Sequence, residues 1–237
     1  MASVLPNDCA LFLFTRFPQP GRTKTRLIPA LGAVGAASLQ RQMTEHLLGR
    51  FQRFYFQRSL QVFFTGGTTQ QMRNWLGNEV RLTPQAKGGL GERLKFALSQ
   101  GFADGLQRIV VVGSDCPDLD ERQIMRALAL LEDHDVVLGP ATDGGYYLIG
   151  LKQFHQPLFE NIPWSTERVW ETTQAIATHH GLSVALLNPL WDIDRPEDLP
   201  LWDNARNVSQ KVLATDPRAR CTGEPGELAV HRLAAHR

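Results

Sequence analysis

Cysteine, net charge and long apolar runs are all scarce in this sequence of 237 residues. Its three cysteines, Cys9, Cys116 and Cys221, are far apart and form no CxxC pair. An odd, widely spaced set of this kind predicts no disulfide framework and indicates a reducing compartment. The 25 basic and 24 acidic residues leave a net charge of +1. That balance disfavours nucleic acid as the main partner.

Other signatures are also missing. No apolar stretch approaches the roughly 20 residues that a membrane-spanning helix needs. The N-terminal residues lack the charged region and long apolar run of a signal peptide. We therefore expect a cytoplasmic protein that does not act at a membrane. The seven histidines show no HExxH or other metal spacing, and no GxGxxG follows the first apolar run, which argues against an NAD-binding Rossmann domain.

What the sequence does contain is an alternation of short apolar runs with longer amphipathic segments. This pattern predicts an α/β fold around a mostly parallel sheet. We expect strands at 9–15, 60–66, 80–84, 108–115, 135–141, 144–151 and 182–188. We expect helices at 33–54, 70–75, 91–101, 121–134 and 166–178. Periodicity weakens near residue 207, so we predict one domain over 1–206 and a C-terminal extension over 207–237.

A basic segment follows the first expected strand. It reads FPQPGRTKTRL at 17–27 and, together with Arg16, carries four basic residues around Gly21. It is not an ATPase phosphate loop, because the first glycine of GxxxxGK[ST] is absent and the remaining spacing is wrong. Ligands of open α/β sheets bind at the carboxyl ends of strands. Lys24 and Arg26 are therefore candidates to bind phosphate oxygens, and a solvated basic turn is the alternative.

A carboxylate follows the most apolar strand, in the segment GSDCPDL at 113–119. Asp115 is expected at the same edge of the sheet as the basic segment. Magnesium and manganese prefer a few carboxylates together with phosphate oxygens, so Asp115 is a candidate half-site for such a metal. The alternative role for these aspartates is helix capping, which we expect of Asp118 or Asp120 because Asp115 lies too early in the chain.

Two further segments carry weaker signals. In WDIDRPEDL at 191–199, Asp192 and Asp194 alternate and so face the same way, which is costly unless a cation offsets them. In ATDGGYYLIGL at 141–151, Gly144 and Gly145 precede a strand. They predict either close contact with a flat ligand or a tight turn between two strands.

Six segments stand in the order PGRTKTRL, GGLGERL, GSDCPDL, DGGYYLIGL, PWSTE and DIDRPEDL. In that order they resemble the bacterial DUF2064-type glycosyltransferases, which share a fold with 2-phospho-lactate guanylyltransferases and molybdopterin nucleotidyltransferases. The resemblance covers residues 11–199. It implies a three-layer αβα sandwich with a mostly parallel mixed sheet, of the GT-A or nucleotide-diphospho-sugar transferase type.

The resemblance also implies roles for individual residues. The nucleotide would be bound by Thr15, Arg16, Gly21, Lys24, Thr25, Arg26, Gly88, Gly89, Gly91 and Ser114. A magnesium or manganese ion would be held by Asp115 and Asp194, with Asp192 as competitor, and Lys24, Asp115 and Asp194 would form the catalytic set. Donor sugar or acceptor would lie against Asp143, Gly144, Gly145, Tyr146, Trp164, Ser165 and Thr166. Arg16 and Gly89 depart from the family, which often has Lys and Asp at these positions.

These residues lead us to expect a metal-dependent enzyme that moves a sugar from a nucleotide-diphospho-sugar to a small-molecule acceptor. A nucleotidyltransferase that joins a nucleoside triphosphate to a phosphorylated acceptor is the alternative, because it needs the same charges. A non-catalytic nucleotide-binding subunit is a third reading. The sequence does not decide between a monomer and a homodimer.

Overall fold

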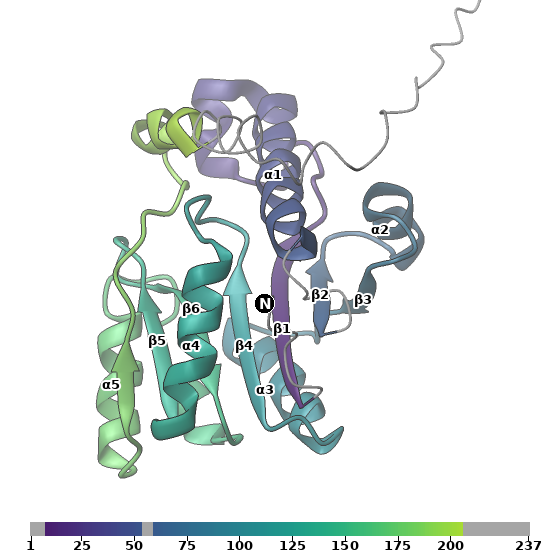
Figure 1. Cartoon of the computed structure of the whole chain (residues 1–237). Helices are drawn as coiled ribbons and strands as arrows, with labels where there is room; N and C mark the ends of the chain where they lie inside the picture. The colour runs from purple at the N-terminus through teal and green to yellow at the C-terminus, as the bar shows by residue number, and fades with distance from the viewer. Residues whose placement is uncertain (1–7, 54–58, 206–237) are drawn as a thin grey trace, which may run out of the picture.

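The computed structural model describes residues 8–53 and 59–205, and these form one mixed sheet with helices on both faces (Figure 1). The strand order is β3-β2-β1-β4-β6-β5-β7, and β6 runs antiparallel to its neighbours β4 and β5. The strands are β1 (Cys9–Arg16), β2 (Leu60–Thr65), β3 (Arg81–Pro84), β4 (Arg108–Gly113), β5 (Val136–Pro140), β6 (Tyr146–Leu151) and β7 (Val184–Leu186). The α-helices are α1 (Ile28–Arg53), α2 (Thr69–Leu76), α3 (Leu90–Ala103), α4 (Glu121–Asp133) and α5 (Val169–His179).

Both faces of the sheet are apolar because each is covered by helices. Successive residues of β1 point to opposite faces, so Leu11 and Leu13 pack with α1, α2 and α4, whereas Phe12 and Phe14 pack with α3 and α5. Figure 1 shows α4 in front of the sheet and α3 behind it. Full burial of one such side chain contributes about 1.5–3 kcal/mol. Two cores on either side of one sheet confirm the predicted αβα sandwich.

The expected elements are present, with shifted ends. The helix expected at 33–54 begins at Ile28, and Gly32 interrupts its first turn with φ 70° and ψ 166°. The strand expected from residue 144 begins at Tyr146, because Gly144 and Gly145 belong to the turn that precedes it. Residue 54 and the predicted extension 207–237 lie outside the described residues.

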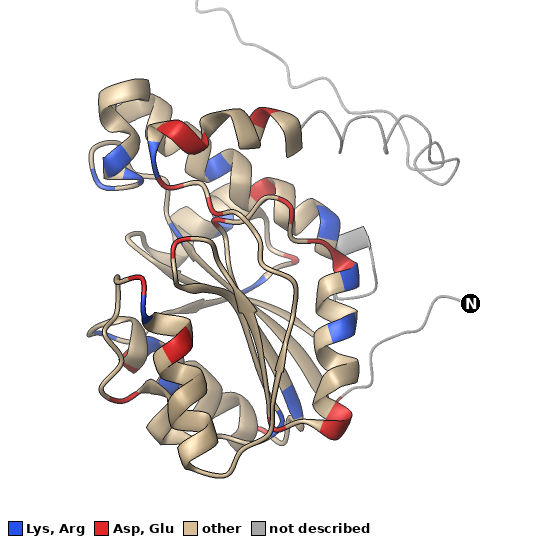
Figure 2. Cartoon of the chain, turned by 90° about the vertical axis from the view of Figure 1, so that its left-hand side faces the viewer, with Lys and Arg blue, Asp and Glu red and all other residues tan. Residues whose placement is uncertain are grey.

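The topology gathers several loops at one edge of the sheet. Strands β1 to β5 are all parallel to one another, so the segments that follow them leave from a common edge. Residues 191–194 join this edge through a bridge between Ala141 and Leu190. Figure 2 shows basic and acidic segments side by side around these loops, at the upper end of the sheet. Among the described helices, none is long and apolar enough to cross a membrane.

Candidate functional site

The basic segment after β1 is folded around a buried threonine. Thr23 is 1% exposed, and its hydroxyl donates to the carbonyl of Phe17 at 3.1 Å while accepting from the N–H of Gln19 at 3.1 Å. Gly21 has a φ of 77°, which an L side chain rarely adopts. These features fix the path of the chain and bring the next residue, Lys24, to the centre of the edge.

Lys24 turns inward and joins the two acidic segments. Its side chain is only 4% exposed, and its Nζ lies 2.8 Å from Asp115 Oδ1 and 4.0 Å from Asp194 Oδ1. The same ammonium donates to the backbone carbonyl of Ile193. Lys24 also has a φ of 48°, in the left-handed region that is uncommon for a residue with a side chain. Such strain persists where the surroundings demand it, and here it brings residues from three distant segments together.

Asp194 forms ion pairs with basic side chains. Its Oδ2 lies 2.6 Å from Arg26 Nη1. The N–H groups of Asp194 and Arg195 donate to Asp198 at 3.0 and 2.7 Å, which fixes the backbone of this segment. Two residues assigned to different ligands by resemblance, Arg26 and Asp194, are thus ion-paired with each other in the described structure.

Asp192 lies near other carboxylates, whereas Asp194 is paired with a basic side chain. Ile193, between the two aspartates, is fully buried and its N–H donates to the carbonyl of Asp115 at 2.9 Å. The two aspartates on either side of it are partly exposed. Burial, together with the nearby carboxylates of Asp143 and Asp115, raises the pKa of Asp192 to about 6. No ion pair to Asp192 occurs among residues 8–53 and 59–205. Its surroundings thus carry excess negative charge.

A buried hydroxyl network adjoins the charged cluster, which is formed by Lys24, Arg26, Asp115, Asp192 and Asp194. Thr15 Oγ1 and Thr44 Oγ1 are 2.8 Å apart, and Gln40 Nε2 donates to Ser114 Oγ at 2.9 Å and to Thr15 Oγ1 at 3.2 Å. All four residues are no more than 5% exposed. Thr15 and Ser114, which the resemblance assigns to the nucleotide, direct their side chains into this network. The network joins β1, β4 and α1 just before Asp115 and so positions that carboxylate.

The loop between β3 and α3 is held by an arginine. Arg93 donates from Nε to the carbonyl of Gly88 at 3.0 Å and from Nη1 to Gln85 Oε1 at 3.4 Å. Gln85 in turn donates to the carbonyl of Phe63 at 3.0 Å. Gly88 and Gly89 are both exposed, although the carbonyl of Gly88 accepts from Arg93 Nε and that of Gly89 from the Arg93 N–H.

Gly144 and Gly145, which the resemblance assigns to substrate binding, are also required by the local backbone structure. Gly144 has a φ of 86°, and a Cβ there would lie 2.1 Å from the carbonyl oxygen of Glu167. Gly145 donates its N–H to Asp143 Oδ1 at 2.7 Å. The segment is a tight turn between β5 and β6 packed on the 163–168 segment. In that segment, Thr166 Oγ1 donates to the carbonyl of Pro163 at 2.7 Å and Ser165 has a φ of 67°.

One sequence prediction about capping is confirmed, and four residues of the site were not predicted. Asp120 caps α4 through the N–H groups of Arg122 and Gln123, as expected. Thr23 and Arg93 gave no signal beyond their place in the motifs. Gln40 and Thr44 could have been found, because they stand one turn apart on the otherwise apolar face of the predicted helix 33–54.

The carboxylate oxygens of Asp115 and Asp192 are the donors that magnesium or manganese prefers. The described residues contain no group of three or more His, Cys, Asp or Glu side chains that could enclose a metal. That arrangement suits an ion which takes one or two carboxylates and completes its shell with phosphate oxygens. The excess negative charge around Asp192 is the observation that fits such an ion.

A mixed αβα sheet with these loops at its carboxyl edge defines a nucleotide-diphospho-sugar transferase-like fold. The model of the family DUF2064, described as "uncharacterized protein conserved in bacteria", matches residues 55–166. A solved structure from Desulfovibrio desulfuricans, named as a "putative nucleotide-diphospho-sugar transferase", is 30% identical with a TM-score of 0.80. That match covers 90% of this chain and 93% of the other. The chain belongs to the DUF2064 family.

More distant solved structures share the fold alone. The inositol-1-phosphate CTP transferase of T. maritima is 13% identical with a TM-score of 0.56, over 89% of this chain and 98% of that one. CMP:2-keto-3-deoxy-manno-octonic acid synthetase, solved with CTP, is 11% identical with a TM-score of 0.53, over 86% and 99%. None of the curated proteins matches the chain closely enough to count as a relative.

Proposed function

We propose that this protein is a transferase that moves a sugar from a nucleotide-diphospho-sugar to a small-molecule acceptor. The observation that carries the proposal is the convergence of Lys24, Asp115 and residues 192–194 at the carboxyl edge of the sheet. The name of the Desulfovibrio desulfuricans relative, which covers nearly the whole chain, supports the same class.

We assign the diphosphate of the donor to this edge. Lys24 and Arg26 lie at this edge, and each is paired with a carboxylate there. In glycosyl transfer, negative charge grows on the departing nucleoside diphosphate as the bond to the sugar breaks. Preorganised cations that meet this charge are usually the largest contribution to catalysis. The partners Asp115 and Asp194 hold Lys24 and Arg26 in place before the donor arrives.

We assign the metal to Asp115 and Asp192, with Asp194 orienting the two basic side chains. Bound there, magnesium or manganese would neutralise diphosphate oxygens. Asp192 is the better second ligand because Asp194 already pairs with Arg26 at 2.6 Å, whereas Asp192 faces other carboxylates. The backbone bond from the Ile193 N–H to the Asp115 carbonyl holds this acidic segment beside the end of β4, and the bond from the Asp194 N–H to Asp198 Oδ2 fixes the path of the segment itself.

Nucleotidyl transfer is the second candidate, favoured by the likeness of the fold to two enzymes whose names refer to CTP or CMP. In that reaction a phosphorylated acceptor attacks the α-phosphate of a nucleoside triphosphate and pyrophosphate leaves. The same cations serve both reactions, so the products decide between them.

The test is incubation of the purified protein with manganese and each common nucleoside triphosphate or nucleotide sugar. Glycosyl transfer predicts slow donor hydrolysis that releases nucleoside diphosphate and free sugar. Pyrophosphate release would establish nucleotidyl transfer instead. The same incubations are repeated with mixed small-molecule acceptors. If the protein binds nucleotide but forms neither product, the hypothesis of a non-catalytic nucleotide-binding subunit is favoured. The Asp115→Asn protein is the matched control, because it keeps the size of the side chain and removes the charge.

A further inference from the structure

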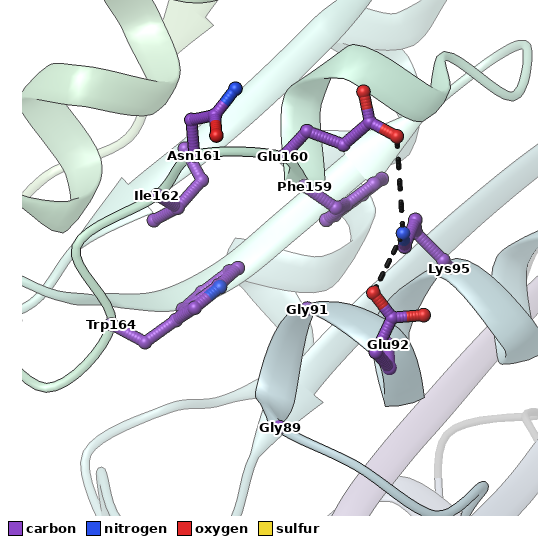
Figure 3. A pocket seen from close by; sticks show the side chains of 9 residues that line it. All are labelled: Gly89, Gly91, Glu92, Lys95, Phe159, Glu160, Asn161, Ile162 and Trp164. Atoms are coloured by element: carbon purple, nitrogen blue, oxygen red, sulfur yellow. Dashed lines mark ion pairs between the residues drawn. The ribbon is translucent and has the colours of Figure 1, made fainter.

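A hollow of about 490 Å³ lies between the start of α3 and the segment 159–164 (Figure 3). We propose that this hollow is the acceptor site and that it takes an uncharged, polyhydroxylated ring such as a pyranose. The inference rests on the proposed function and names the class of its second substrate. The lining residues are Gly89, Gly91, Glu92, Lys95, Phe159, Glu160, Asn161, Ile162 and Trp164. Its volume is within the usual range for small-molecule sites.

The charges in the hollow disfavour an anionic ligand. Its one basic residue, Lys95, lies 2.7 Å from Glu92 Oε1 and 3.9 Å from Glu160 Oε1, and Figure 3 draws both ion pairs. One ammonium between two carboxylates leaves a net negative charge. A phosphate or carboxylate group entering the hollow would meet that charge without a free cation to offset it. The carboxylates, by contrast, are good acceptors for hydroxyl groups.

The wall of the hollow offers a flat apolar surface. Trp164 is half-buried, and the absence of a side chain at Gly91 permits its close approach, since a Cβ there would lie 2.8 Å from Trp164 Nε1. Within the part of the chain that the structure describes, the indole N–H of Trp164 has no hydrogen-bond acceptor. An aromatic face with a free donor and nearby carboxylates combines apolar contact with polar groups that set orientation, as small-molecule sites do.

A chain of contacts joins the hollow to the charged cluster. The ring of Trp164 packs edge-on against the ring of Tyr146, with centroids 6.2 Å apart. Tyr146 follows Gly145, which is bound by Asp143, and Asp143 lies close enough to influence Asp192. The hydroxyl of Tyr146 is buried and lacks a hydrogen-bond partner among the described residues. A buried hydroxyl without a partner is costly, but Tyr146 is not among the residues that line the hollow, and its ring supports Trp164 from behind.

Saturation-transfer NMR tests the inference with defined probes. The probes are the methyl glycosides of glucose, galactose and mannose, against glucose 1-phosphate and glucose 6-phosphate. Each is measured alone and with manganese and a mixture of nucleoside diphosphates. We expect transfer to ring protons of at least one methyl glycoside and none to the sugar phosphates. Binding of the phosphates alone, or of no probe in either condition, would overturn the inference.

Variants locate the site. Trp164→Ala should weaken glycoside binding by about tenfold or more. Tyr146→Phe is a control that keeps the ring behind Trp164. It should leave glycoside binding unchanged and the melting temperature unchanged or higher, because the hydroxyl that it removes is buried and has no partner among the described residues. Trp191→Ala removes a different tryptophan, which precedes Asp192 and is 55% exposed. Loss of binding in Trp191→Ala rather than in Trp164→Ala would place the ring elsewhere and contradict the proposal.

A gain-of-binding variant guards against a misfolded Trp164→Ala protein. The double substitution Glu92→Gln and Glu160→Gln frees Lys95 from both partners. It should create binding of glucose 6-phosphate that the wild type lacks, by about fivefold or more over background. If the double variant still does not bind glucose 6-phosphate, Glu92 and Glu160 are not what excludes anionic ligands, and the proposal is contradicted.

Nucleotide binding keeps the two proposals separate. Trp164→Ala should bind nucleoside diphosphates as the wild type does, because the proposed diphosphate site lies at Lys24 and Asp115. A wild-type protein that binds glycosides but no nucleotide would refute the proposed function alone. One that binds nucleotides but no glycoside would refute the acceptor site alone.

Discussion

Two aspartates at opposite edges of the same sheet have pKa values shifted in opposite directions. At the amino edge, Asp135 accepts from the hydroxyl and the N–H of Ser183 at 2.6 and 2.8 Å and pairs with Lys152 at 3.1 Å. These bonds lower its pKa to about 2. At the carboxyl edge, burial and neighbouring carboxylates raise the pKa of Asp192 to about 6.

The difference separates charge that stabilises the fold from charge that destabilises it. Asp135 joins the start of β5 to the residue before β7, and its ionised form is fully satisfied. Asp192 is ionised at a cost, and Lys24, which contacts the neighbouring residues Ile193 and Asp194, has a strained backbone conformation. Strain and unpaired charge of this kind are typical of sites where a ligand later completes the arrangement.

The largest effect is expected at the centre of the carboxyl edge. Lys24→Met removes the one cation that joins Asp115 and Asp194. Loss of one preorganised group of this kind costs roughly 10²–10³ in turnover. Steady-state rates of donor consumption measure it. Arg41→Met serves as a control, because Arg41 forms an exposed ion pair with Glu45 on α1. Equal rates for both variants would contradict the role of Lys24.

The next largest effect is on stability. Gly144→Ala would place a Cβ 2.1 Å from the backbone oxygen of Glu167, at a φ of 86°. We expect a loss of about 3 kcal/mol in the free energy of unfolding, which lowers the melting temperature by roughly 6–12 °C. Gly49→Ala in α1 is the matched control, since nothing lies within 4 Å of its Cβ position. That substitution should raise stability by about 0.5–1 kcal/mol.

Asp192→Asn should stabilise the metal-free protein, in a pH-dependent way. Because the folded pKa of Asp192, about 6, is above the ordinary value of 3.8 for aspartate, the folded state binds the extra proton between these two pH values. Stability from this group is therefore present at pH 4 and is lost as the pH rises through 6. We expect Asp192→Asn to gain about 2 kcal/mol at pH 7.5 and almost nothing at pH 4. Urea unfolding in the presence of a chelator measures both.

Asp135→Asn should have the smallest effect and the opposite sign. Its folded pKa of about 2 is below the ordinary value of 3.8 for aspartate, so its ionised form contributes stability above pH 4. That contribution is lost as the pH falls from 4 toward 2. We expect Asp135→Asn to lose about 1 kcal/mol at pH 7.5. If Asp192→Asn also lowers stability at pH 7.5, the charge of Asp192 does not destabilise the fold, and the contrast with Asp135 is contradicted.

Much of the fold was predictable because burial imposes it on the sequence locally. The run RIVVVG can only be a strand covered on both faces, and parallel topology then brings Lys24 and Asp115 to one edge. The ends of elements were less predictable. Gly144 and Gly145 belong to a turn because of the backbone at Glu167, which is distant in sequence.

The details of the site depend on contacts that no local pattern reveals. The pairing of Arg26 with Asp194 joins residues 168 positions apart, and that of Lys95 with Glu160 crosses from α3 to the end of a 3₁₀ turn. The left-handed conformation of Lys24 follows from its three partners rather than from its residue type. The sequence could therefore nominate residues for the site, whereas the pairs they form required the structure.

The most direct test of the central claim is pulsed electron–nuclear double resonance of Mn²⁺ bound with each of the common nucleoside diphosphates. If the metal joins the acidic edge to the diphosphate, one nucleotide will give a ³¹P hyperfine coupling that disappears in the Asp115→Asn protein. A ³¹P coupling of equal strength in Asp115→Asn, or nucleotide binding that gives no coupling to manganese, would contradict the account.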